Sequence, residues 1–146
     1  VYRLSAAGGA LFPRRYKEAL ERVLDYVESR DGRLAAVAAL ESHFDALADR
    51  LTAQLQGASP AERMDAVVGA LSEAGYMAEG WSTFCCGPLT AHNCAISDVA
   101  ARFPEICAAE ERFLESVLGG TVERRSNMLT GCASCEYKVA FPQERV

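Results

Sequence analysis

Apolar residues in the first half of the chain recur at intervals of three and four, the spacing of one helical face. One such run begins at Pro13 and ends at Gly32, a residue that readily takes the left-handed conformation that closes helices. A second run spans residues 33–56, with apolar positions at Val37, Leu40, Phe44, Leu47, Leu51 and Leu55. Their spacing is typical of a coiled-coil seam between two chains or of one buried face within a chain.

The segment that begins at Ser59 predicts the start of a third helix. Ser59 suits the N-cap, Pro60 the first helical position, and Glu62 the return bond of a capping box. Apolar residues follow at helical spacing as far as Gly75: Met64, Val67, Val68 and Leu71.

After Gly75 the pattern changes. Residues 76–86 and 89–92 predict two strands joined by a turn at Gly87–Pro88. A helical stretch from Ile96 is interrupted before Pro104, which can open another helix.

Gly119 and Gly120 end that helix, and residues 122–129 predict a weak edge strand. Residues 135–141 predict a strong strand, because apolar and polar side chains alternate there. The expected fold class is therefore α+β, with N-terminal helices followed by a β-β-α-β-β module that forms an antiparallel sheet.

Composition limits the class of protein. The chain has 146 residues, a formal net charge of −5 and 50% hydrophobic residues, which is enough for a core of its own. The negative charge argues against a surface made for phosphate backbones. No segment approaches the roughly 18 apolar residues of a membrane span, and no signal-peptide pattern is present, so we expect a cytoplasmic protein without a membrane partner.

The six cysteines are the main candidates for chemistry. Four follow the spacing C-x12-C-x24-C-x2-C and two lie just upstream: Cys94, Cys107, Cys132 and Cys135, then Cys85 and Cys86. In a reducing cytoplasm, clustered cysteines bind metal or respond to oxidants more often than they form disulfides.

The predicted elements suggest which cysteines act together. Cys94 falls at a strand-to-helix junction, Cys107 on the apolar face of a helix and Cys135 on the inward face of the last strand, so all three can point into one space. Singly, each could also be a small buried hydrophobic residue. His92 could add a nitrogen ligand, whereas the pair of Cys132 with Cys135 is weak evidence for zinc by itself.

Cys85, Cys86 and His43 are weaker candidates for a functional site. Cys85 and Cys86 are adjacent on a predicted strand, so their side chains should point to opposite faces and should not share one metal. His43 lies on a helix near Glu41 and Asp45, where a solvated helix face explains it better than acid–base catalysis. We therefore expect no enzyme.

Four segments of the second half form a composite motif: HNCAI at residues 92–96, VA-x-x-FPE-x-C-x-x-E at residues 99–110, LG at residues 118–119 and CEYKV at residues 135–139. The motif resembles the C-terminal sensor region of the SufR family, winged-helix repressors of iron–sulfur cluster assembly operons. Residues 1–16 resemble the end of the wing strand and the linker helix of the same family. Ala95 stands where the family usually has proline.

The resemblance implies that Cys94, Cys107 and Cys135 bind a [4Fe-4S] or [2Fe-2S] cluster. It also implies a homodimer that binds operator DNA through winged-helix elements before residue 1, with Arg3 as a wing residue. The implied domains are the end of the wing at residues 1–12, linker and dimerisation helices at 13–56, and a sensor domain at 57–146.

The function expected from this resemblance is the redox-sensing and dimerisation region of a transcriptional repressor. Two alternatives remain open. One is a small-molecule sensor domain similar to the vinyl-reductase type, in which a pocket would be the functional feature. The other is a structural zinc domain that uses Cys94, Cys107, Cys132 and Cys135 in a closed tetrahedral site.

Overall fold

The computed structural model describes residues 15–143, which fall into two compact units that divide between Ala36 and Val37. The expected wing at residues 1–12, with Arg3, and the expected helix start at Pro13 lie outside the described residues. Among the residues described, no helix has the length and hydropathy needed to cross a membrane.

The first unit is built on helix α2 (Tyr16–Asp31), which ends as predicted at Gly32. Gly32 has a φ of 87°, and its N–H donates to the carbonyl of Glu28 at 3.0 Å. This conformation suits a residue without a Cβ. One face of α2 leaves Tyr16, Leu20 and Val23 exposed.

Helix α3 (Arg33–Gln54) carries the predicted apolar stripe, and from Val37 onward the stripe faces the core of the second unit. Phe44 and Leu51 are buried, and the ring of Phe44 lies 5.6 Å from that of Phe113 on helix α6 (Glu105–Leu118). Leu40, Leu47 and Leu55 pack against the same core. The stripe is therefore a buried face within one chain.

Helix α4 (Pro60–Glu73) begins with the predicted capping box. The Ser59 N–H donates to Glu62 Oε2 at 2.7 Å, and the Glu62 N–H donates to Ser59 Oγ at 3.3 Å. These bonds to Ser59 lower the pKa of the Glu62 carboxyl. The box satisfies N–H groups that a helix start leaves without intrahelical partners.

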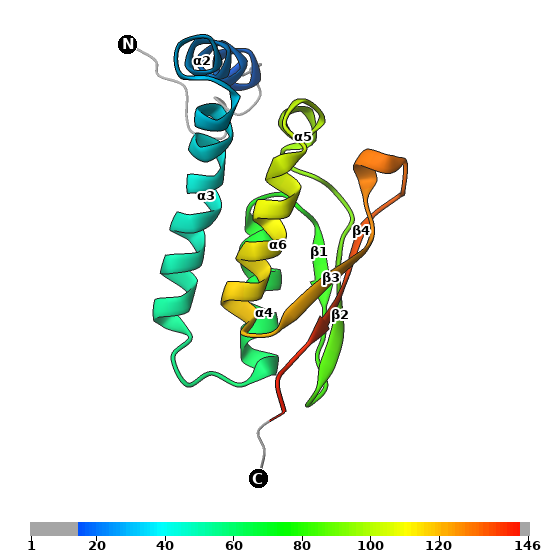
Figure 1. Ribbon diagram of the computed structural model, residues 1–146. Helices are drawn as coiled ribbons and strands as arrows, with labels where there is room; N and C mark the ends of the chain where they lie inside the picture. The colour runs from blue at the N-terminus through cyan, green and yellow to red at the C-terminus, as the bar shows by residue number, and fades with distance from the viewer. Residues whose placement is uncertain (1–14, 144–146) are drawn as a thin grey trace, which may run out of the picture. The chain divides into compact units, whose positions relative to one another are not determined.

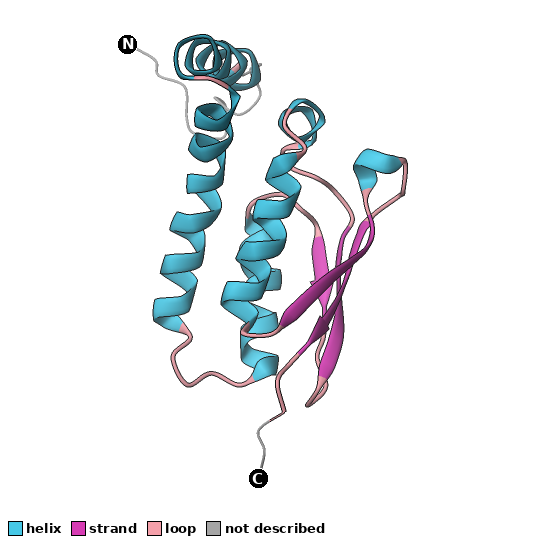
Figure 2. Ribbon diagram, in the orientation of Figure 1, coloured by secondary structure: helices cyan, strands magenta, loops and turns pink. Residues whose placement is uncertain are grey.

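Four antiparallel strands form the sheet, in the spatial order β1-β2-β4-β3. The strands are β1 (Ala78–Gly80), β2 (Cys86–Ala91), β3 (Thr121–Ser126) and β4 (Cys135–Ala140). The remaining elements are α5 (Ser97–Arg102) and a 3₁₀ turn (Met128–Thr130). Figures 1 and 2 show α4 and α6 on one side of the sheet.

This architecture confirms the α+β class, the antiparallel sheet and the position of β3 at an edge. Cys135, Tyr137 and Val139 of β4 point into the core, as the alternation predicted, while Glu136 and Lys138 are exposed. From α6, the large apolar side chains that join the core are Ile106, Phe113, Leu114, Val117 and Leu118.

The predicted turn at Gly87–Pro88 is wrong, because both residues belong to β2. The turn lies earlier: the N–H of Trp81 donates to the carbonyl of Pro88 at 3.3 Å, and that of Thr83 to the carbonyl of Cys86 at 2.8 Å. The N–H and carbonyl of a strand residue lie on the same side, and the carbonyl of Pro88 faces Trp81. The N–H that proline lacks would therefore also face Trp81, so its absence leaves the ladder with β4 intact.

Gly87 is required for a different reason. A Cβ at this position would lie 1.9 Å from the carbonyl oxygen of Trp81. The glycine thus marks a close approach of the Trp81–Ser82 backbone to β2 and not a reversal of the chain.

We expect Ser59→Ala to lower the free energy of unfolding by about 1 kcal/mol, because the variant loses the N-cap bond. Urea denaturation followed by circular dichroism measures this change. Ser42→Ala is the matched control: Ser42 is exposed on α3 and bonds only the carbonyl of Ala39 in its own helix, so alanine should not destabilise there. Equal losses in both variants would contradict the capping role.

Candidate functional site

Cys94, Cys107 and Cys135 line a single cavity of about 150 Å³. Each comes from a different element: the loop between β2 and α5, the first turn of α6 and the first residue of β4. The structure therefore brings together the three thiols that the sequence analysis selected. The other residues that line the cavity are Asn93, Ser97, Glu110, Asn127, Met128 and Leu129.

Backbone hydrogen bonds hold the loop that carries Cys94. The N–H of His92 donates to the carbonyl of Met77 at 3.2 Å, and that of Asn93 to the carbonyl of Tyr76 at 3.0 Å. The Asn93 side chain donates to the carbonyl of Gly75 at 2.7 Å. These bonds fix the backbone directly before Cys94.

Cys107 is positioned by the start of α6, where its N–H donates to the carbonyl of Pro104 at 3.1 Å. Cys135 is positioned by the 3₁₀ turn, since the N–H of Met128 donates to its sulfur at 3.4 Å. Asn127 Oδ1 lies 3.9 Å from the same sulfur and caps the turn by accepting from Leu129 N at 2.9 Å.

A carboxylate shares the cavity with the three thiols. Glu110 is only 6% exposed, and burial raises the pKa of its carboxyl, while the nearby Arg124 acts against that rise. Arg124 Nη2 lies 3.8 Å from Glu110 Oε2. Glu110 is the last residue of the motif at residues 99–110, but the motif alone indicated no role for it. A charged residue on the apolar face of α6, three positions after Cys107, was the signal that could have identified it.

Tyr76 adds a buried hydroxyl near this group. Its Oη has no hydrogen-bond partner among the described residues, although the side chain is buried. Burial raises the pKa of Tyr76, and charges on Glu110, Cys94 and Cys107 would raise it further, so these groups lie close to the phenol. An unpaired buried hydroxyl is costly and indicates a site that can accept another polar partner.

Burial raises the pKa of the Cys94 and Cys107 thiols, and Arg124 partly offsets the rise at Cys107. At neutral pH these thiols are therefore protonated in the free protein. A metal can bind them only by displacing their protons, as thiolate ligation requires.

Two sequence candidates do not join the cavity. His92 is exposed, and its Nε2 lies 2.7 Å from Glu79 Oε1. Cys132 is also exposed, 3.9 Å from Thr130 Oγ1. It does not line the cavity, although its N–H donates to the carbonyl of Asn127, a residue that does.

The four cysteines of the zinc alternative are consequently not gathered at one point. Within residues 15–143, no group of three or more His, Cys, Asp or Glu side chains is arranged to hold a single metal ion.

The expectation that the side chains of Cys85 and Cys86 point to opposite faces of a strand is wrong. Cys85 lies at the tip of the β1–β2 hairpin and only Cys86 is in a strand, so the alternation of side chains does not apply to the pair. Their sulfur atoms are 3.3 Å apart.

The burial of the cavity thiols predicts their reactivity. In reduced, metal-free protein at neutral pH, iodoacetamide should modify Cys94 and Cys107 several-fold more slowly than the exposed Cys132, because burial limits access and raises their pKa. Peptide mapping by mass spectrometry over time gives the three rates. In guanidinium chloride the rates should converge, and equal rates in the folded protein would refute the described cavity.

Comparison with protein-family models, with curated proteins and with solved structures gives no match to this chain. The indications of function are therefore the geometry of this cavity and its donor atoms.

Proposed function

We propose that this chain is the sensor region of a transcriptional repressor and that it binds an iron–sulfur cluster through Cys94, Cys107 and Cys135. The cluster would be of the [4Fe-4S] or [2Fe-2S] type, and the genes controlled would be those of iron–sulfur assembly. The observation that carries the proposal is the convergence of three thiols from three separate elements on one cavity of about 150 Å³.

The donor atoms suit such a cluster. Thiolates are the soft ligands that iron–sulfur clusters prefer. A polynuclear cluster presents different irons to different thiolates, so its ligands lie farther apart than those of one zinc ion. The zinc alternative also requires Cys132, which is exposed and does not line the cavity.

Glu110 is the best candidate for a fourth ligand. Its buried carboxylate lines the cavity, whereas His92 and Cys132 do not. A carboxylate oxygen is a harder donor than a thiolate and binds iron of a cluster less firmly. Three thiolates and one weaker ligand would make the site labile, which suits a sensor better than a structural site.

When bound, the cluster supplies a group that can be lost or oxidised in response to its surroundings. Its three cysteine ligands would attach three elements to it. Cys94 would attach the β2–α5 loop, Cys107 helix α6 and Cys135 strand β4. Protonated thiols make no such link, so the free protein would hold these elements together only by packing and hydrogen bonds. Occupancy would therefore change how firmly α6 is held.

Helix α6 connects the cavity to α3. Phe113 packs on Phe44, and Arg112 Nη2 donates to Glu41 Oε1 at 2.7 Å. The chain passes between its two units through α3. A change at the cavity could reach the first unit along this helix. This requires that the cluster bind one arrangement of α6 more tightly than another.

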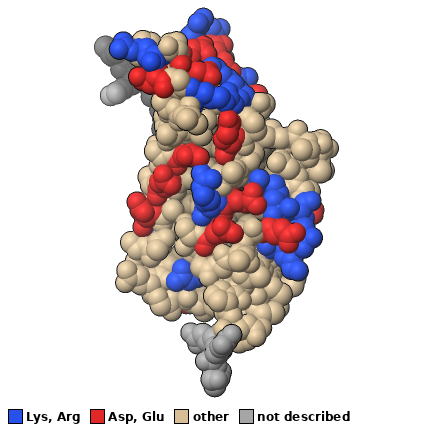
Figure 3. Space-filling model, in the orientation of Figure 1, with Lys and Arg blue, Asp and Glu red and all other residues tan. Residues whose placement is uncertain are grey.

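DNA binding and dimerisation belong to the proposal through the N-terminal region. On the face seen in Figure 3, basic side chains lie among acidic ones and form no broad basic surface. In line with the resemblance to winged-helix repressors, we assign operator contacts to elements at or before the wing, including Arg3. The exposed apolar residues of α2, Tyr16, Leu20 and Val23, support a homodimer formed by residues 13–56.

Protein purified without oxygen should be brown and contain matched iron and sulfide. Cys94→Ser, Cys107→Ser and Cys135→Ser should each lose most of the iron, because each removes one thiolate from the cavity. Cys132→Ser should retain the wild-type content, since this thiol is exposed elsewhere. Absorption spectra with iron, sulfide and zinc analysis provide the measurement.

Two results would contradict the cluster. A colourless protein with one zinc per chain would favour the structural zinc site. A colourless, metal-free protein that cannot be reconstituted with iron and sulfide would favour the small-molecule sensor.

Glu110→Gln should leave the cluster bound but increase its rate of loss to an iron chelator by about 10-fold, as expected when an oxygen ligand is weakened. Glu111→Gln is the matched control, because Glu111 pairs with Arg124 at 2.9 Å but does not line the cavity. Bleaching of the cluster absorbance gives the rates, and circular dichroism checks folding. Equal rates in both variants would exclude Glu110 as a ligand.

A further inference from the structure

The tip of the β1–β2 hairpin carries a second group of thiols. Phe84 and Cys85 form the tip, and Cys86 begins β2. Cys86 pairs with Ala140 at one end of the β2–β4 ladder, whereas Cys135 pairs with Ala91 at the other end. The hairpin thiols are therefore remote from the cavity that holds Cys94, Cys107 and Cys135.

The two hairpin thiols are held side by side. Their sulfur atoms are 3.3 Å apart, and Thr83 Oγ1 lies 3.8 Å from each of them. The backbone beneath is fixed, since the N–H of Phe141 donates to the carbonyl of Cys85 at 2.8 Å. Both thiols are partly exposed. The pair is thus a preformed and accessible dithiol.

This spacing favours a bridging atom over a direct disulfide. A disulfide bond is about 2.05 Å long and usually joins residues whose Cα atoms are at least about 4.4 Å apart. Adjacent residues across a trans peptide have Cα atoms only about 3.8 Å apart. A direct disulfide would require the sulfur atoms to move from 3.3 Å to about 2.05 Å apart, whereas one atom bound between them would not. Such an atom must bind two sulfurs at nearly a right angle, as trivalent arsenic does.

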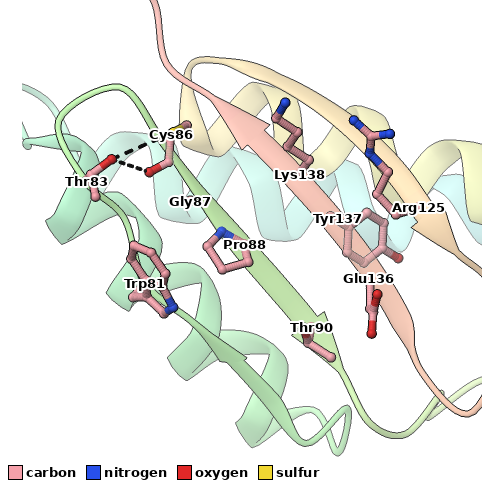
Figure 4. A pocket seen from close by; sticks show the side chains of 10 residues that line it. All are labelled: Trp81, Thr83, Cys86, Gly87, Pro88, Thr90, Arg125, Glu136, Tyr137 and Lys138. Carbon is pink, nitrogen blue, oxygen red and sulfur yellow. Dashed lines mark hydrogen bonds between the residues drawn. The ribbon is translucent and has the colours of Figure 1, made fainter.

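A surface cavity of about 590 Å³ adjoins the dithiol. Thr83 and Cys86 line one part of it, and Trp81 and Pro88 lie beside them (Figure 4). Trp81 is the only tryptophan of the chain and is 61% exposed. The indole and proline surfaces offer apolar contact to an organic substituent on the bound atom.

We propose that Cys85 and Cys86 form a site that chelates a monosubstituted trivalent arsenical, with its organic group in the adjoining cavity. With phenylarsine oxide, the arsenic–oxygen bond breaks and two arsenic–sulfur bonds form. The oxygen leaves as water with the two thiol protons. No electrons are transferred, because arsenic stays trivalent and neither sulfur changes its oxidation state.

The electrostatics of the pair agree with this chemistry. Hydrogen bonds from the side chains of Cys86 and Thr83 lower the pKa of the Cys85 thiol. A lower pKa increases the fraction of thiolate, which is the form that attacks arsenic. Burial has the opposite effect on Cys94 and Cys107, whose pKa values it raises. The hairpin pair should therefore react first.

Titration of the reduced full chain with phenylarsine oxide tests the proposal. Trp81 fluorescence should change and saturate at one equivalent, and mass spectrometry should show one adduct formed with loss of one water. Cys85→Ser and Cys86→Ser should each weaken binding by about 100-fold or more, because a single thiol loses the advantage of chelation. Cys132→Ser, which removes an exposed single thiol, should bind as the wild type does.

Alkylation after the titration assigns the thiols. Cys85 and Cys86 should be protected at one equivalent and should become reactive again after addition of dimercaptopropanol. Protection confined to Cys94, Cys107 and Cys135, or unchanged affinity in folded Cys85→Ser protein, would overturn the proposal. Iron content is measured separately, so failure here leaves the proposed cluster untouched.

Discussion

The interactions on which the cavity depends are those of the largely buried guanidinium of Arg124. It donates to the carbonyl of Cys107 at 2.7 Å and to Glu111 Oε2 at 2.9 Å, and it lies 5.1 Å from the ring centre of Tyr137. It also provides the positive charge that lets Glu110 be buried. One side chain from β3 therefore joins α6 to the sheet and balances the charge beside three thiols. Without it, the carboxylate would be an uncompensated buried charge, which is strongly destabilising.

The two groups of cysteines show how one functional group acquires different chemistry from its surroundings. Cys94 and Cys107 are partly buried in a cavity, and this burial raises the pKa of both thiols. Cys85 lies at a hairpin tip where hydrogen bonds lower its pKa and the next thiol is 3.3 Å away. Thiols from three separate elements could hold a polynuclear cluster, whereas an adjacent pair could hold one bridging atom.

Much of the architecture could be read from local patterns. The stripe on α3, the capping box at Ser59 and the alternation in β4 each reflect interactions between residues close in sequence, and the structure has all three. The prediction of a turn at Gly87–Pro88 was wrong because glycine and proline occur often, but not always, in turns. Here the glycine allows a close approach of Trp81, and the proline lies where its missing N–H does not interrupt the β2–β4 ladder.

The sequence by itself determined the α+β class and selected Cys94, Cys107 and Cys135, because their positions on a junction, a helix face and a strand face follow from periodicity. Only the tertiary structure decided that Cys132 and His92 do not line the cavity and that Glu110 does. It also placed the sulfurs of Cys85 and Cys86 in contact. The physical reason is that periodicity fixes a side chain's direction within a regular element. The direction of a residue in a turn, and the meeting of residues from separate elements, depend on how the elements pack.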